Sequence, residues 1–117
     1  MNNKPKYHLF KNTKYALDGL VHALKTESSF RLELFFAFFI IGMIIYIDTS
    51  ITNKLILFVT GILVLIVELI NSAIENVVDL VTKDIKPLAK SAKDIGSAAV
   101  MFSIILHICC WIVILVF

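Results

Sequence analysis

The sequence is poor in residues that interrupt helices and poor in charge. Its 117 residues include two prolines and four glycines, and 17% are charged, whereas 59% are hydrophobic. Soluble globular domains contain roughly 45 to 50% apolar residues, and the mean hydropathy of this chain is +0.90. The composition therefore predicts an integral-membrane protein with short connections, which we interpret as a single domain over residues 1–117.

Several familiar signals are also absent. The chain has no glycine-rich phosphate-binding loop, which excludes the commonest type of nucleotide site. Residues 1–14 are polar and basic with short apolar interruptions, so no cleaved signal peptide is expected. Cys109 and Cys110 are adjacent, which fits neither a redox pair nor a zinc site, and we interpret them as packing residues.

Hydrophobic patterning predicts an all-α fold with one amphipathic helix and three membrane spans. The amphipathic helix covers about residues 9–28, and we expect it to lie at the membrane surface. The spans cover about residues 32–48, 54–80 and 95–117. Residues 1–8 are expected to form a mobile arm.

The basic residues predict the orientation of the spans. They crowd the N-terminal region and the connection at residues 83–93, where Pro87 is expected to prevent a continuous helix. The connection at residues 48–54 has only Lys54. The positive-inside rule places the first two regions in the cytoplasm and, after three spans, the C-terminus outside.

A polar stripe lies on the second predicted span. At about 100° per residue, Glu68, Asn71, Glu75 and Asp79 fall within an arc of roughly 80°. A charge at membrane depth costs on the order of 2.5 to 3.5 kcal/mol on insertion scales. Three carboxylates and an amide facing one way suit a hard divalent cation such as Mg²⁺ together with a general base.

Polar residues from three segments are expected to meet on the cytoplasmic side. Glu27 precedes the first span, Glu75 and Asp79 end the second, and Lys93 and Asp94 precede the third. Carboxylates for a cation, a lysine for phosphate charge and a half-buried glutamate facing lipid are the parts needed to move a phosphoryl group from a nucleotide to a membrane-embedded alcohol.

Other interpretations of the same residues remain open. Glu27 and Arg31 are spaced as an ordinary i, i+4 pair that stabilises a helix by only about 0.2 to 0.5 kcal/mol. Glu68 could be the intramembrane acid of a small oligomeric protein that conducts ions or protons. A purely structural membrane subunit is a third possibility, although it leaves the stripe unexplained.

The third span carries two further features. Ala92, Gly96, Ala99 and Ser103 place small side chains along one face, which permits close helix packing. His107 is the only ionisable residue of this span. It is expected to be neutral and hydrogen-bonded, or to face a partner subunit, rather than to bind a metal.

The motifs of the chain resemble those of the small integral-membrane prokaryotic diacylglycerol kinases, which are related to the undecaprenol kinases of Gram-positive bacteria. The resemblance extends over almost the whole chain from about Leu9. It depends on these motifs: Gly19-Leu20, Glu27, Phe30-Arg31, Glu33, Glu68-Leu-Ile-Asn-Ser-Ala-Ile-Glu75, Val77-Val78-Asp79 and Ala92-Lys93-Asp94-Ile-Gly-Ser-Ala-Ala-Val100.

This resemblance implies a homotrimer with a surface helix and three spans per subunit, and active sites shared between neighbouring subunits. It implies that Glu68 is the general base and that Glu27 and Glu75 hold a Mg²⁺ ion that bridges the ATP phosphates. The ATP side would further include His8, Tyr15, Lys86, Lys93 and Asp94. Arg31, Glu33 and Ser97 would lie near the lipid with Glu68, and Asn71 and Asp79 would support the site.

The chain departs from the family pattern on the nucleotide side. His8, Ala16 and the pair Ile85-Lys86 stand where Gram-negative members carry an arginine, a serine and an aromatic-histidine pair. Lys86 could replace some of these contacts. Ser72 and the Gly96-Ser97 pair look more like the diacylglycerol kinases than the undecaprenol kinases. The implied reaction is phosphorylation of diacylglycerol to phosphatidic acid, with undecaprenol as the alternative lipid.

Overall fold

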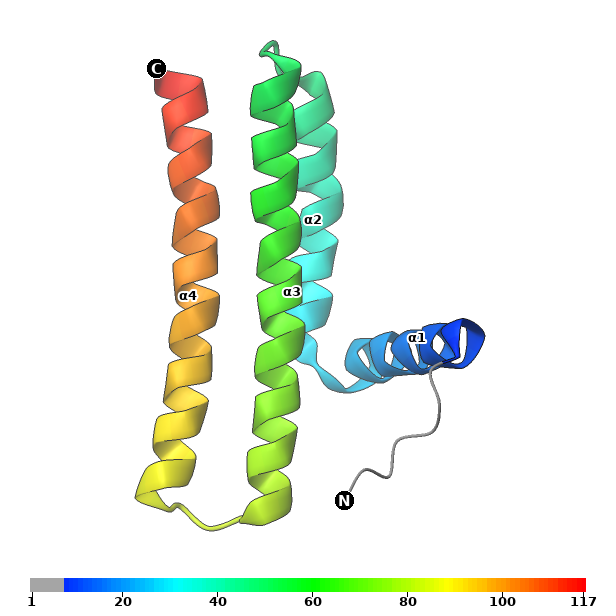
Figure 1. The fold of residues 1–117 in the computed structure, drawn as a ribbon. Coiled ribbons are helices and arrows are strands. Elements are labelled where there is room, and N and C mark those ends of the chain that lie inside the picture. Colours follow the sequence, from blue (N-terminus) through cyan, green and yellow to red (C-terminus); the bar gives the residue numbers. More distant parts are fainter. Residues whose placement is uncertain (1–7) are drawn as a thin grey trace.

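The computed structural model describes residues 8–117, which fold into four helices. They are α1 (Leu9–Thr26), α2 (Ser28–Tyr46), α3 (Ile51–Val81) and α4 (Pro87–Val116), with no strand in the described part of the chain. α2, α3 and α4 run side by side, and α1 projects away from the end at which α2 begins (Figure 1). The predicted all-α fold is confirmed. The predicted mobile arm, apart from His8, lies outside the described residues.

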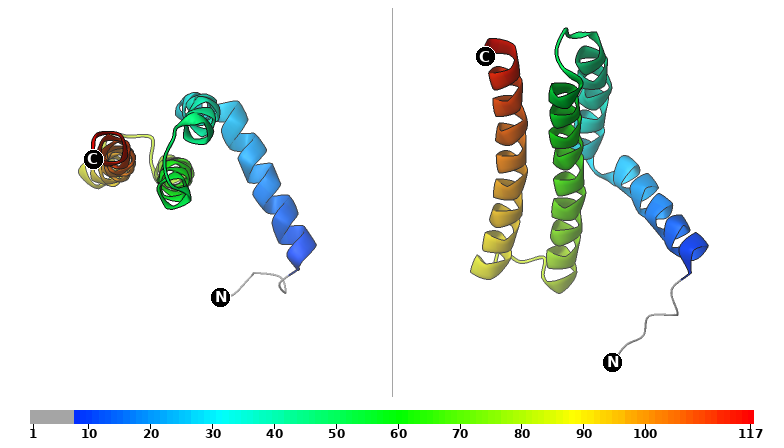
Figure 2. Two further views of the ribbon diagram at one scale, coloured as in Figure 1. Left: turned by 90° about the horizontal axis from the view of Figure 1, so that it is seen from above. Right: turned by 45° about the horizontal axis from the view of Figure 1, so that its top comes forward.

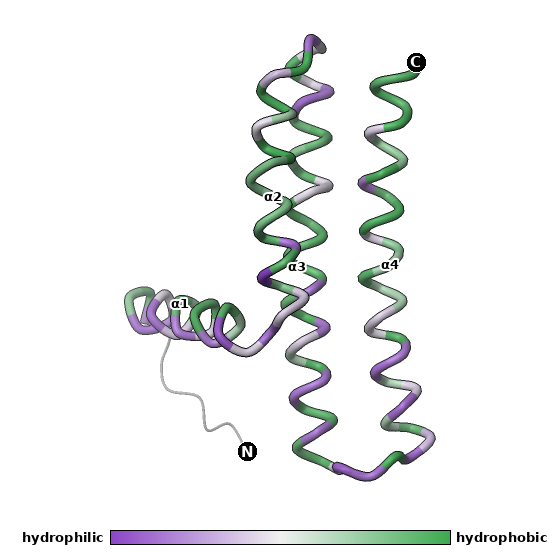
Figure 3. Tube along the Cα trace, turned by 180° about the vertical axis from the view of Figure 1, so that it is seen from behind, coloured by the Kyte–Doolittle hydropathy of each residue, from purple (hydrophilic) through white to green (hydrophobic). Residues whose placement is uncertain are grey.

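Three of the helices are long and apolar enough to cross a membrane. α2 has 19 residues and is about 28 Å long, close to the roughly 30 Å of a hydrocarbon core. α3 and α4 have 31 and 30 residues and are about 45 Å long. They extend past the start of α2, and most of their charged residues lie in this extension (Figure 3).

α3 lies between α2 and α4 when the helices are viewed end-on (Figure 2). Its contact with α4 is the most extensive, followed by its contact with α2, whereas α1 chiefly contacts α2. Gly96 and Ser103 are buried, and Ala92 is half-buried, as expected for a close-packed face of α4. Ala99 is exposed instead. The buried face of α4 follows Gly96, Ser103 and His107, and Ala99 lies to one side of it.

The helix ends differ in places from the predicted ranges. α1 ends at Thr26 and α2 begins at Ser28, because Glu27 between them is extended with φ −108° and ψ 102°. The Ser50 side chain accepts a hydrogen bond from the Asn53 backbone N–H at 3.1 Å, so α3 begins earlier than predicted. α4 also begins early, at Pro87, because proline is well tolerated in the first turn of a helix.

Candidate active site

The polar stripe predicted on the second span is present on α3. Glu68 and Asn71 have only 5% and 7% of their surface exposed, and Glu75 and Asp79 are half-buried closer to the end of the helix. Removing a carboxylate from water is expensive unless another group compensates its charge. The burial of Glu68 therefore identifies this part of α3 as the candidate reaction centre.

Glu33 of α2 lies beside Glu68. The two carboxylates are close enough for their charges to interact, and Glu27 and Glu75 also act on Glu68. Oε2 of Glu33 is buried and has no hydrogen-bond partner among the described residues. Glutamates from the α1–α2 junction, α2 and α3 thus gather at one end of the spans, where a cation or a hydrogen-bond donor would offset their repulsion.

Asn71 faces Gly96 of α4, which has no side chain. Its Nδ2 donates a hydrogen bond to Oε1 of Glu75 at 3.3 Å. Its Oδ1 is buried without a partner in the described chain, and a Cβ on Gly96 would overlap this oxygen. Gly96 therefore makes room for the amide, which leaves a free acceptor next to the glutamates.

Two ion pairs lie at the polar end of α4. Nζ of Lys93 contacts Oδ1 of Asp79 at 2.7 Å and so links α4 to α3. Nζ of Lys90 contacts Oδ2 of Asp94 at 2.5 Å within α4. The side chains of both pairs are at least 40% exposed, so their charges remain accessible to a polar ligand.

At the α1–α2 junction, Arg31 does not form the i, i+4 ion pair with Glu27 that their spacing suggested. Nη1 of Arg31 donates to the carbonyl oxygens of Leu24 at 3.0 Å and Lys25 at 3.1 Å, which belong to the last turn of α1. No ion pair joins Arg31 to Glu27 in residues 8–117. Glu27 instead lines a cleft of about 350 Å³ between α1 and α3. Arg31 satisfies carbonyls that a helix end leaves free, and so fixes the bend.

Comparison with known proteins assigns these residues to a family. The sequence model of the prokaryotic diacylglycerol kinases matches residues 14–115. A diacylglycerol kinase of Helicobacter pylori (strain 26695) is 39% identical over 103 residues, which cover 88% of this chain and 80% of the relative. The diacylglycerol kinase of Haemophilus influenzae is 37% identical over 97 residues, which cover 83% of this chain and 82% of the relative. The diacylglycerol kinase of Escherichia coli K12 is 35% identical over 107 residues, which cover 92% of this chain and 88% of the relative. The chain belongs to the prokaryotic diacylglycerol kinase family.

Membership in the diacylglycerol kinase family confirms the resemblance drawn from the motifs. It makes the chain a bacterial multi-pass membrane protein and a lipid kinase, and removes the ion-conducting and purely structural alternatives. The family match begins at residue 14 and includes every predicted site residue except His8.

Four residues that the resemblance assigns to the site are exposed in this chain. Tyr15 on α1 is 59% exposed. His8 precedes α1, Lys86 precedes α4 and Ser97 lies on α4, and all three are exposed. No hydrogen bond or ion pair joins any of them to Glu68 in the described part of the chain. Their roles stay predictions.

We call Glu27, Glu33, Glu68 and Glu75 the acidic cluster. Its carboxylate oxygens are ligands that suit Mg²⁺, but by themselves they do not form a complete metal site. No group of three or more His, Cys, Asp or Glu side chains within residues 8–117 is arranged to hold a metal ion. Mg²⁺ is commonly bound by one or two carboxylates together with water and substrate phosphates. Glu27 and Glu75, whose charges both act on Glu68, offer two carboxylates for this partial role.

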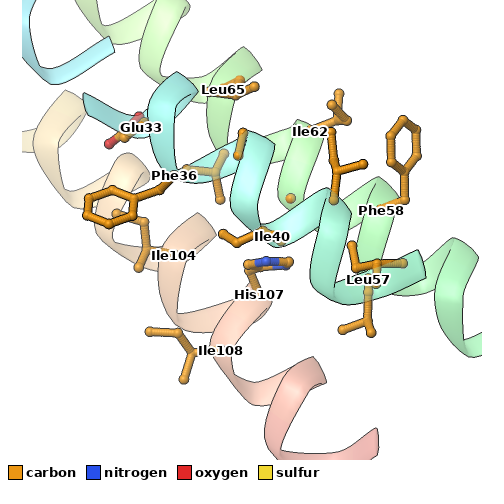
Figure 4. Close-up of a pocket in the computed structure, with 15 residues that line it drawn as sticks. Glu33, Phe36, Ile40, Leu57, Phe58, Ile62, Leu65, Ile104, His107 and Ile108 are labelled. Carbon is orange, nitrogen blue, oxygen red and sulfur yellow. The ribbon is translucent and has the colours of Figure 1, made fainter. Parts of the chain in front are cut away.

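The kinase also contains an apolar groove that sequence reasoning missed. It has a volume of about 240 Å³, is lined by α2, α3 and α4, and includes Glu33 in its lining (Figure 4). Apart from Glu33 and His107, all its lining residues are apolar. The available signal was the spacing of Leu57, Gly61 and Val64, which lie on the same face of α3 as Glu68.

His107 is buried and hydrogen-bonded, as predicted. Nε1–H of Trp111 donates to Nε2 of His107 at 3.0 Å, so Nε2 must be unprotonated. The neutral ring therefore carries its proton on Nδ1, which lies 2.8 Å from Oγ1 of Thr60. That hydroxyl donates to the Ile56 carbonyl at 2.8 Å. These bonds fix the ring between α3 and α4.

Proposed function

We propose that the protein transfers the γ-phosphoryl group of ATP to the free hydroxyl of diacylglycerol and releases phosphatidic acid. The observation that carries this proposal is the burial of Glu68 where an apolar groove meets the acidic cluster. A lipid hydroxyl can reach such a position from the bilayer, and a nucleotide can reach it from the polar extension of α3 and α4. The names of the similar kinases support diacylglycerol as the acceptor.

In the proposed reaction, Glu68 takes the proton of the lipid hydroxyl. The lipid oxygen forms a bond to the γ-phosphorus of ATP while the bond from that phosphorus to the bridging oxygen breaks, and ADP leaves. A positioned base typically contributes about 10²- to 10⁴-fold in rate. The remaining acceleration is assigned to alignment of the two substrates and to stabilisation of phosphate charge.

Positive charge at the polar end of the spans supports the phosphate side of the site. Lys93 projects from α4 with its ammonium held by Asp79, which directs it toward the face of α3 that carries Glu75. We assign Glu27 and Glu75 to a Mg²⁺ ion. When bound, this ion would neutralise part of the charge of the ATP phosphates. Asp94 and Asn71 would orient the groups around it.

We further propose that the active sites are shared between the subunits of a homotrimer. Ser97, Lys86 and Asp94, which the family resemblance assigns to the site, are exposed and make no hydrogen bond or ion pair with Glu68 in the described part of the chain. Contacts from a neighbouring subunit would complete the site and cover these side chains. Because ATP is a cytoplasmic substrate, the same proposal places the polar ends of α3 and α4, and the N-terminus, on the cytoplasmic side.

The test is transfer of labelled γ-phosphate from MgATP by purified protein in mixed micelles, with diacylglycerol and undecaprenol offered separately. Labelling of diacylglycerol as phosphatidic acid is expected. Preferential labelling of undecaprenol would reassign the acceptor while keeping the chemistry. If neither lipid is labelled by protein that is folded and oligomeric, the proposed reaction is wrong.

The role of Glu68 is tested by the variant Glu68→Gln, which preserves the size of the side chain and removes the base. Labelling is expected to fall at least about 100-fold, the lower end of the range for a base, with no change in oligomeric state by size-exclusion chromatography. Asp84→Asn is the matched control, because Asp84 is an exposed acid in the α3–α4 connection. Normal turnover of Glu68→Gln would eliminate Glu68 as the base.

A further inference from the structure

We propose that the groove between α2, α3 and α4 receives an acyl chain of the lipid substrate, and that His107 is a specificity-determining residue that sets how deeply this chain can enter. The inference depends on the lipid kinase function proposed above. It assigns a role to a residue that the proposed phosphoryl transfer leaves unused.

The groove is continuous with the acidic cluster. Leu57, Gly61, Val64 and Glu68 follow one another on α3 at intervals of four, three and four residues, so the groove and the proposed base share one face of the helix. Glu33, which lines the groove, lies beside Glu68. An acyl chain in the groove would therefore carry its glycerol end to the carboxylates.

The unpaired oxygen of Glu33 favours a lipid over a second copy of the chain as the occupant. Oε2 of Glu33 is buried without a partner in the described chain, and a buried acceptor is costly to leave unsatisfied. The glycerol end of a diacylglycerol brings its one hydroxyl to the adjacent carboxylates, where it can donate to Glu33 on binding before Glu68 takes the proton, and it brings an apolar tail to the rest of the groove. The apolar face of a neighbouring helix would fill the groove without supplying the donor.

His107 forms a step partway along the groove. Its ring packs over Gly61, where an added Cβ would lie 3.2 Å from Cε1 of the ring. Gly61 is seven residues from Glu68, or about 10 Å along α3. Figure 4 shows the ring lying among apolar side chains, including Ile40 and Leu57.

The ring can limit the depth of the groove because its position is fixed. Nε2 accepts from Trp111 and Nδ1 donates to Thr60, so neither nitrogen has to be solvated by an occupant of the groove. An acyl chain meets ring carbons, which are compatible with a hydrocarbon tail, but the chain cannot displace the ring without breaking both hydrogen bonds.

The test compares the kcat/KM of the enzyme for diacylglycerols with long and short saturated tails, dipalmitoylglycerol and didecanoylglycerol, in the same mixed micelles. His107→Ala removes the step and is expected to raise the long-to-short ratio about 3- to 10-fold. This is less than the tenfold or more per methylene in pockets filled from water, because lipid tails already surround the protein. Gly61→Ala narrows the groove and is expected to lower the ratio. Leu106→Ala, an exposed neighbour outside the groove, is the control and is expected to leave it unchanged.

An unchanged ratio in active His107→Ala and Gly61→Ala enzymes would overturn the role of His107. If the unmodified protein phosphorylated no diacylglycerol at all, the proposed function would fail instead, and the two failures are thus distinguishable. The ratio is measured within each variant, so a general loss of folded enzyme does not alter it.

A second measurement uses the unmodified protein and needs no turnover. A diacylglycerol with a photoreactive diazirine in its tail is expected to label the groove residues Ile40 and Ile104. Label confined to the exposed residues Phe38 and Phe102 would overturn the proposal, because these side chains lie outside the groove. Cross-links from groove residues to a second copy of the chain, without lipid label, would assign the groove to a subunit interface and overturn it as well.

Discussion

Replacing Gly96 with alanine is expected to damage both the packing of α3 against α4 and the active site. The new Cβ would overlap Oδ1 of Asn71, a buried side chain that donates to Glu75. Either the two helices move apart, or Asn71 rotates and loses that hydrogen bond. Overpacking of a close interface costs about 1 to 3 kcal/mol, and a hydrogen bond to a charged group contributes a similar amount, about 1.5 to 3 kcal/mol.

A loss of this size in the transition state corresponds to a decrease of about 5- to 150-fold in kcat/KM. It is measured by steady-state transfer of phosphate from ATP, together with the thermal unfolding temperature of the protein in detergent. Gly42→Ala is the matched control, because no atom lies within 4 Å of the Cβ that it would add. This control is expected to keep normal kinetics and stability.

The double variant Asn71→Ala/Gly96→Ala tests the cause of the damage. Without the amide there is no overlap, so its unfolding temperature is expected to equal that of Asn71→Ala alone, which is a strong departure from additivity. If Gly96→Ala behaves like Gly42→Ala in both assays, the close approach of Asn71 to α4 does not shape the site and the reasoning is refuted.

Three further predictions concern charged residues. Glu75→Gln is expected to raise the Mg²⁺ concentration for half-maximal rate several-fold, and an unchanged metal titration would argue against Glu75 as a ligand. Asp79→Asn frees Lys93 and is expected to raise KM for ATP with little change in thermal unfolding, because exposed ion pairs stabilise proteins weakly. Lys90→Gln, which breaks the other pair, is its control. Arg31→Gln removes two hydrogen bonds to the end of α1 and is expected to speed amide hydrogen exchange there; unaltered exchange would contradict a role of Arg31 in the bend.

Local patterns were sufficient to predict the helices and the polar face of α3. The apolar runs and the period of 3.6 residues depend only on neighbours in the chain, and they predicted the three spans and the stripe from Glu68 to Asp79. Helix ends were less accurate. Pro87 was interpreted as a break within a connection, although a proline can equally open a helix.

Partners between helices could not be predicted from the sequence. The spacing of Glu27 and Arg31 suggested an ion pair, but the extended backbone at Glu27 separates them and Arg31 binds the end of α1. Lys93 and Asp94 are adjacent in the chain, yet Lys93 pairs with Asp79 of α3 and Asp94 with Lys90. Such choices depend on the rotation and spacing of packed helices.

The sequence by itself determined the membrane class of the protein, its helices and, through its motifs, its kinase family, because hydropathy, periodicity and motif spacing are properties of the chain alone. Only the tertiary structure decided that Gly96 makes room for Asn71, that Glu33 lies beside Glu68, and that His107 is fixed across a groove by Thr60 and Trp111. These relations join residues far apart in the chain, and they exist only once the helices pack at a particular distance and rotation.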